Sequence, residues 1–166
     1  MALWKDGAFA AQDFATVADG EPLPDGAVIV SLKRFLDERE AILGRNTPIG
    51  VLLQPADRLE PIVEDLPRLA VLALAFPKFG DGRAFSLARL ARERHGFAGE
   101  LRAVGDILFD RIAYMLRCGF TALDIANEPT IKELESGRRP GPHEHYQPTG
   151  ADVARANPLR PWRRLA

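Results

Sequence analysis

The sequence predicts an α/β domain with a mostly parallel sheet, and three observations support this prediction. Short apolar segments alternate with amphipathic segments at intervals of roughly 20–30 residues, which is typical of β-then-α units. Several apolar segments lack the alternation of a half-exposed strand, which indicates parallel strands covered on both faces. About five such units are expected, too few for a closed eight-fold barrel, so the sheet is either an open doubly wound sheet or a partial barrel.

The elements follow in chain order. The apolar run 27–32 comes after the turn-rich stretch 19–26 and predicts the first strand of the repeat. The next segment, 33–44, is expected to form a helix that stops at Gly44 and has an apolar side of Phe35, Leu36, Ile42 and Leu43. Further strands are expected at 49–53, 70–76, 100–105 and 121–126, and further helices at 56–67, 84–96, 106–119 and 129–137.

The two ends of the chain do not follow this repeat. Residues 1–19 are expected to add an edge hairpin through Leu3, Trp4 and Phe9. Beyond residue 136, proline and arginine become frequent and periodicity is lost, which predicts an extended arm at 137–166. We therefore expect a single α/β domain at 1–136 followed by this arm, in which Trp162 either faces a partner or belongs to a flexible tail.

Composition and charge argue against several classes of protein. The chain has 166 residues, which suits one domain, and its 22 basic against 23 acidic residues disfavour a bulk nucleic-acid binder. Its single cysteine cannot form an internal disulfide, and the sequence shows neither a signal peptide nor a run of roughly 20 apolar residues. We therefore expect a cytoplasmic protein with no nucleic-acid partner and no membrane partner.

The stretch FPKFGDGRAFS at residues 76–86 is the strongest candidate for a functional site. It follows the most apolar strand, and ligands of α/β sheets bind beyond the carboxyl ends of strands. Glycines, the free N–H groups of the next helix and nearby cations are the components of an oxyanion site. The alternative is a simple turn in which Asp81 caps the helix and the cations are solvated. The predicted anion-binding residues are Lys78, Gly80, Gly82, Arg83, Ser86 and, from the next strand, Arg102.

The next predicted strand adds further charged residues. Glu100 and Arg102 fall on the same side of it because side chains alternate with a period of two. They either pair with each other or lie near an exposed strand end, since buried charges need partners. Asp106 follows this strand and could cap the next helix. If the protein is catalytic, Asp81 and Asp106 are the candidate general bases.

The predicted helix 106–119 has a polar stripe of Asp110, Tyr114 and Arg117, spaced at i, i+4 and i+7. We interpret this stripe as a solvated or partner-facing surface. The opposite, apolar side is expected to consist of Leu108, Ile112, Met115 and Leu116.

Cofactor motifs are not found in the sequence. It has no G-x-G-x-x-G, no P-loop, no C-x-x-C and no G-x-S-x-G, so no cofactor is predicted. We interpret Cys118 as a buried small residue, because a reactive thiol would need a cation or base nearby. The pair His143 and His145 lacks further clear ligands, so no metal is predicted either.

Residues 76–120 resemble an uncharacterised bacterial family labelled as oxidoreductases of sulfite reduction. The pattern is F-P-x-F-x-D-G-R, a serine and an arginine-rich helix, then G-E-L-R-A-V-G-D and finally R-C-G-F. The matching residues are Phe76, Pro77, Phe79, Asp81, Gly82, Arg83, Ser86, Arg89, Gly99, Glu100, Leu101, Arg102, Gly105, Asp106, Arg117, Cys118, Gly119 and Phe120.

The resemblance implies a role in reducing sulfite to sulfide, because genes of this family lie beside that of the assimilatory sulfite reductase haemoprotein. The first hypothesis is an accessory protein that binds this haemoprotein through the polar stripe and the arm and holds a small oxyanion in the loop. The second is a stand-alone enzyme that acts on a small anionic substrate. The third is an electron-transfer subunit whose cofactor uses no known motif.

Overall fold

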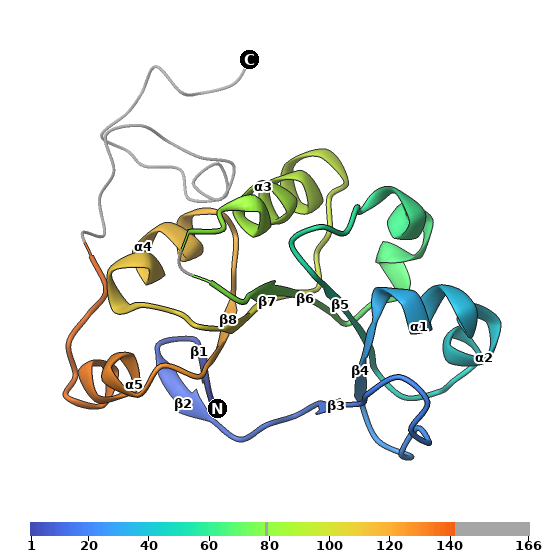
Figure 1. Ribbon diagram of the computed structural model, residues 1–166, viewed down its shortest axis with the longest axis horizontal. Coiled ribbons are helices and arrows are strands. Elements are labelled where there is room, and N and C mark those ends of the chain that lie inside the picture. Colours follow the sequence, from blue (N-terminus) through green and yellow to red (C-terminus); the bar gives the residue numbers. More distant parts are fainter. Residues whose placement is uncertain (79, 142–166) are drawn as a thin grey trace.

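The computed structural model of the chain describes residues 1–78 and 80–141 (Figure 1). Eight strands form one sheet in the order β2-β1-β8-β7-β6-β5-β4-β3. The strands from β3 to β8 run parallel in chain order, and β1 is antiparallel to both of its neighbours. The strands are β1 (Ala2–Lys5), β2 (Ala8–Ala10), β3 (Ala15–Thr16), β4 (Val28–Ser31), β5 (Ile49–Leu53), β6 (Val71–Phe76), β7 (Glu100–Gly105) and β8 (Ala122–Ile125).

The sheet is a curled half-barrel. Its strand order is sequential and has no point at which the order reverses, so the partial barrel is correct and the doubly wound alternative is wrong. The five predicted strands correspond to β4–β8. The expected hairpin is present as β1 and β2, with positive φ at Asp6 and Gly7 in its tight turn, and β3 is an additional strand.

The chain connection between the two edge strands requires this curvature. Strands β2 and β3 form opposite edges of the sheet, which would lie about 34 Å apart if eight strands were flat. Only residues 11–14 link them, and the five steps from Ala10 to Ala15 span at most about 18 Å. Figure 1 shows this link crossing the side of the sheet opposite α3 and α4. We call residues 11–14 the strap and the side that it crosses the inner face.

The helices pack on the outer face. They are α1 (Leu32–Asp37), α2 (Arg39–Leu43), the 3₁₀ helix η1 (Glu60–Arg68), α3 (Arg83–Arg89), the π-helical turn η2 (Leu90–Arg94), α4 (Phe109–Arg117) and α5 (Glu128–Glu135). The segment predicted as one helix at 33–44 divides at Glu38. Two leucines expected on apolar sides, Leu36 and Leu116, are instead 40% and 36% exposed. None of the helices in the described residues is long and apolar enough to cross a membrane.

Two hydrophobic clusters show how the faces differ. The main core joins one side of β4–β8 to all of the helices, including Phe35 of α1, Ile112 of α4 and Leu134 of α5. A smaller cluster on the inner face consists of Ile29, Val71 and Ala73, with Phe14 of the strap packed against it. The expectation that the strands are covered on both faces is therefore met by helices on one face and, in part, by the strap on the other.

Candidate functional site

Three connections come together at the carboxyl edge, where strands β6, β7 and β8 end. The backbone N–H of Asp106 donates to the carbonyl of Phe76 at 3.0 Å, and that of Ala126 donates to the carbonyl of Gly105 at 3.0 Å. The segments after the three strands are therefore neighbours. This edge holds Lys78 and Asp106, both exposed, as the sequence analysis expected from the ends of neighbouring strands.

Asp81 and Arg83 in the loop after β6 pair with each other. The Asp81 carboxylate accepts the backbone N–H of Arg83 at 3.1 Å, its Nε at 3.0 Å and its Nη2 at 2.7 Å. These hydrogen bonds lower the pKa of Asp81 to about 2. Asp81 thus satisfies one free N–H at the start of α3 and balances the charge of Arg83, although the N-cap position itself is Gly82, without a side-chain cap, and Arg83 is paired instead of solvated. The exposed Ser86 and the two loop glycines remain candidates for anion binding.

Arg102 does not join this loop, because it lies on the inner face and is 1% exposed. Its Nε donates to Glu100 at 2.6 Å and its Nη2 donates to Asp13 of the strap at 2.6 Å. Burial tends to lower the pKa of Arg102, but the hydrogen bonds to Asp13 and Glu100 raise it overall. The expected Glu100–Arg102 pair is therefore present, and Arg102 is separated from the other predicted anion ligands.

The ion pairs of Arg102 extend along the inner face. Lys5 of β1 donates to the second carboxylate oxygen of Glu100 at 2.5 Å and lies 3.9 Å from Asp13. The Phe14 ring lies 5.4 Å from the Arg102 guanidinium carbon, within the range of a cation–π contact. These contacts bind the strap to the sheet, so we interpret the network as structural.

Asp106 connects two strand ends. Its carboxylate accepts a hydrogen bond from the side-chain amide of Asn127 at 3.1 Å, while the side-chain oxygen Oδ1 of Asn127 caps α5 by accepting the backbone N–H of Thr130 at 3.1 Å. The prediction that Asp106 caps the following helix is wrong, because α4 begins after Leu108 without a side-chain cap. A role for Asp106 as a general base stays a prediction.

The polar stripe of α4 lies at the surface, where Asp110 and Tyr114 are exposed and Arg117 is half-buried. Tyr114 is 48% exposed, and its ring centroid lies 4.9 Å from that of Phe85 on α3. The two helices are therefore neighbours, and Tyr114 stands where they meet. The other partner-facing candidate, Trp162, lies outside the described residues, as do His143 and His145.

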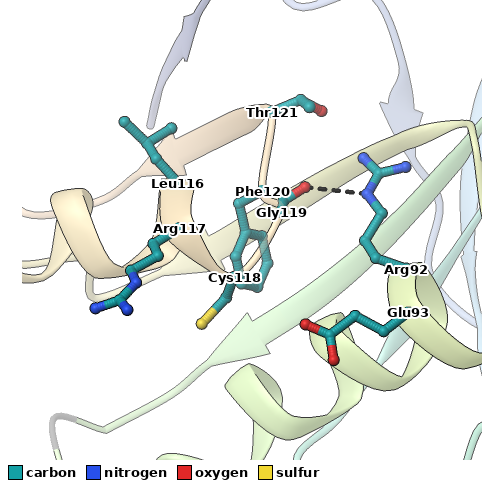
Figure 2. A pocket seen from close by; sticks show the side chains of 8 residues that line it. All are labelled: Arg92, Glu93, Leu116, Arg117, Cys118, Gly119, Phe120 and Thr121. Carbon is teal, nitrogen blue, oxygen red and sulfur yellow. Dashed lines mark hydrogen bonds between the residues drawn. The ribbon is translucent and has the colours of Figure 1, made fainter. Parts of the chain in front are cut away.

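A pocket of about 380 Å³ lies between η2 and the end of α4 (Figure 2). On one side Arg92 donates from Nε to the carbonyl of Gly119 at 3.1 Å and from Nη1 to that of Gly99 at 2.7 Å, which ties η2 to the segments before β8 and β7. The pocket is lined by Arg92, Glu93, Leu116, Arg117, Cys118, Gly119, Phe120 and Thr121. The sequence analysis did not predict it, although its R-C-G-F motif supplies half of this lining.

Cys118 is a buried residue, as predicted from the sequence. Cys118 is 4% exposed, and burial raises the pKa of its thiol, although a hydrogen bond with Tyr114 opposes this shift. The thiol is therefore protonated at neutral pH. Within residues 1–78 and 80–141, no three His, Cys, Asp or Glu side chains are grouped so that they could hold a metal ion.

Fold and surface together define a half-barrel α/β protein with an open carboxyl edge and a pocket in its outer helical layer. The profile of a family described as bacterial protein of unknown function (DUF934) matches residues 50–157, which is more than half of the chain. The chain belongs to this family. A search of curated proteins found no match.

Proposed function

We propose that this chain is a cytoplasmic accessory protein of assimilatory sulfite reduction, in the pathway from sulfate to cysteine, and that it binds the sulfite reductase haemoprotein. The resemblance of residues 76–120 to a family linked to that enzyme supports the pathway. The observation that carries a binding role is Tyr114 on α4, which is 48% exposed beside Phe85 of α3. Tyrosine is enriched among the residues that dominate protein interfaces.

The internal pairing of two candidate cations, Arg83 and Arg102, favours binding of a partner over catalysis. An anion clamp must offer its charge to the substrate, whereas Arg83 is engaged by Asp81, and Arg102 by Asp13 and Glu100. A substrate would have to displace these carboxylates before it could use either guanidinium. The ring of Tyr114 on α4 is 48% exposed, so a partner can reach it without displacing such an ion pair.

Binding of the purified haemoprotein to the full chain tests this proposal. We expect Tyr114→Ala to weaken binding about 10-fold or more, because truncation of an interface tyrosine commonly removes at least ~1.4 kcal/mol. Phe9→Ala is the matched control, because Phe9 is an aromatic residue of similar exposure (38%) on the distant strand β2. Absence of any binding by the unaltered chain would refute the proposed function.

A second candidate function is a stand-alone enzyme that acts on a small oxyanion such as sulfite. It is favoured by the exposure of both Lys78 and Asp106 at the carboxyl edge, where half-barrels and barrels hold their ligands. Titration of the chain with sulfite, followed by amide NMR, tests it. Saturable shifts at Gly80 and Gly82 that are lost in Lys78→Ala would support this function, and their absence at millimolar sulfite would contradict it.

A further inference from the structure

The outer layer formed by α3, η2 and α4 carries a surplus of positive charge. Its elements contain six arginines and two carboxylates, and Asp81, which pairs with Arg83 from the loop before α3, adds a third carboxylate. The layer therefore has an excess of three positive charges, although the chain as a whole has a net charge of −1. Contact between the Phe85 and Tyr114 rings makes the layer continuous. Its charged residues are Arg83, Arg89, Arg92, Glu93, Arg94, Asp110, Arg111 and Arg117.

Within this basic layer the pocket provides an apolar socket. Leu116, Cys118 and Phe120 supply apolar lining, and the guanidinium-bearing side chains of Arg92 and Arg117 lie around it (Figure 2). The one carboxylate of the lining, Glu93, accepts two hydrogen bonds from Arg89 at 3.2 and 3.3 Å. The volume, about 380 Å³, falls within the usual range of sites that hold one compact group.

We propose that this socket receives one aromatic side chain from an acidic segment of a partner protein. This inference rests on the proposed function and specifies the part of the partner that is recognised. An aromatic anchor fills the apolar lining and covers Leu116, while carboxylates beside the anchor face the arginine-rich layer and steer the approach. Nucleic acid would match the charge but not the apolar lining, so an acidic protein segment is the better fit.

A peptide probe tests the socket without the haemoprotein. We would titrate the full chain with the blocked peptide Glu-Glu-Trp-Glu-Glu and follow the amide signals of Cys118, Gly119 and Thr121 by NMR. We expect saturable shifts there, at least 10-fold weaker binding of Glu-Glu-Ala-Glu-Glu, and no saturation with Lys-Lys-Trp-Lys-Lys. No shift at these amides, equal binding of the alanine peptide, or tighter binding of a single-stranded oligonucleotide would overturn the inference.

A pair of matched leucines tests the same socket in the complex. Leu116→Glu places a negative charge at the socket, and Leu36→Glu places the same charge on α1 at a leucine of nearly equal exposure. We expect Leu116→Glu to weaken the binding of both the peptide and the haemoprotein at least 10-fold. Leu36→Glu should change the affinity for either by less than two-fold. If the haemoprotein binds equally to both variants, the socket inference fails and the proposed function stands. If only the peptide binds, the proposed function fails and the socket remains.

Discussion

Arg83 and Arg102 have the same side chain but opposite environments. The Arg83 side chain is 63% exposed, and its partner Asp81 is two residues away in the same loop. The Arg102 side chain is 1% exposed, and one of its partners, Asp13, is 89 residues away in sequence. The sequence analysis placed both in one anion site because both follow the pattern of a cation near a strand end. The position of the partner carboxylate in the sequence, local for Arg83 and distant for Arg102, distinguishes the surface ion pair from the structural one.

The energetic consequences of the two pairs differ for a physical reason. An exposed pair exchanges hydration for a screened attraction and contributes little to folding. A buried charge that loses its partners keeps its desolvation cost without compensation, which makes removal of one member of a buried network strongly destabilising. The following predictions test this difference, from the largest expected effect to the smallest.

We expect Arg102→Ala to lower the free energy of unfolding by about 3 kcal/mol, because it removes one of the two cations paired with the nearly buried Glu100 and frees the strap from the sheet. Urea unfolding, followed by the fluorescence of Trp4, measures this change. Arg83→Ala is the control and should shift the unfolding midpoint only slightly. A similar shift for both variants would contradict the distinction between the two arginines.

Asp13→Ala should lower the free energy of unfolding by a smaller amount, about 1–2 kcal/mol. Arg102 keeps its ion pair with Glu100 in this variant, and the side chain of Asp13 is itself 42% exposed. The change should also loosen the strap selectively. Hydrogen exchange at residues 12–15 should accelerate in Asp13→Ala, while exchange in the central strand β6 should change only with global stability. Equal acceleration in both regions would show that the strap has no local role.

The smallest effect concerns the dependence of stability on pH. The pKa of Asp81 is lowered in the folded chain to about 2, so its contribution is present above the unfolded value near 4 and is lost as the pH falls from about 4 to 2. Asp81→Asn should therefore differ slightly from the unaltered chain at pH 6, and the difference should vanish at about pH 2. Thermal unfolding of both proteins across this range is the measurement. A difference that persists at low pH would mean that the Arg83 contact is not electrostatic.

Local patterns in the sequence predicted much of this fold. The apolar runs located β4–β8 closely, because a buried strand must be apolar wherever it lies in the sheet. Side chains alternate between the two faces of a strand, so the period of two correctly predicted that Glu100 and Arg102 lie side by side on one face. Strand order has no local signature, which is why the sequence could not separate a half-barrel from a doubly wound sheet.

The candidate site was predicted less well than the fold. The pairing of Arg102 with Asp13 depends on a distant segment that no periodicity marks. The pocket depends on how η2 approaches the end of α4, where Arg92 binds backbone carbonyls rather than side chains. Lys78 and Asp106 were placed correctly, because the ends of neighbouring parallel strands necessarily lie at one edge.

The pairing of β1 with β8 has a consequence for the order of folding. Leu3 aligns with Asp124 in this register, so β1 pairs with a strand that lies far from it in the sequence. Contacts of such long sequence separation form late, because the intervening chain must be ordered before they become favourable. Strand β1 is therefore among the last strands to take its place in the sheet. Until then the inner face lacks the ion pairs that Lys5 forms with Glu100 and Asp13.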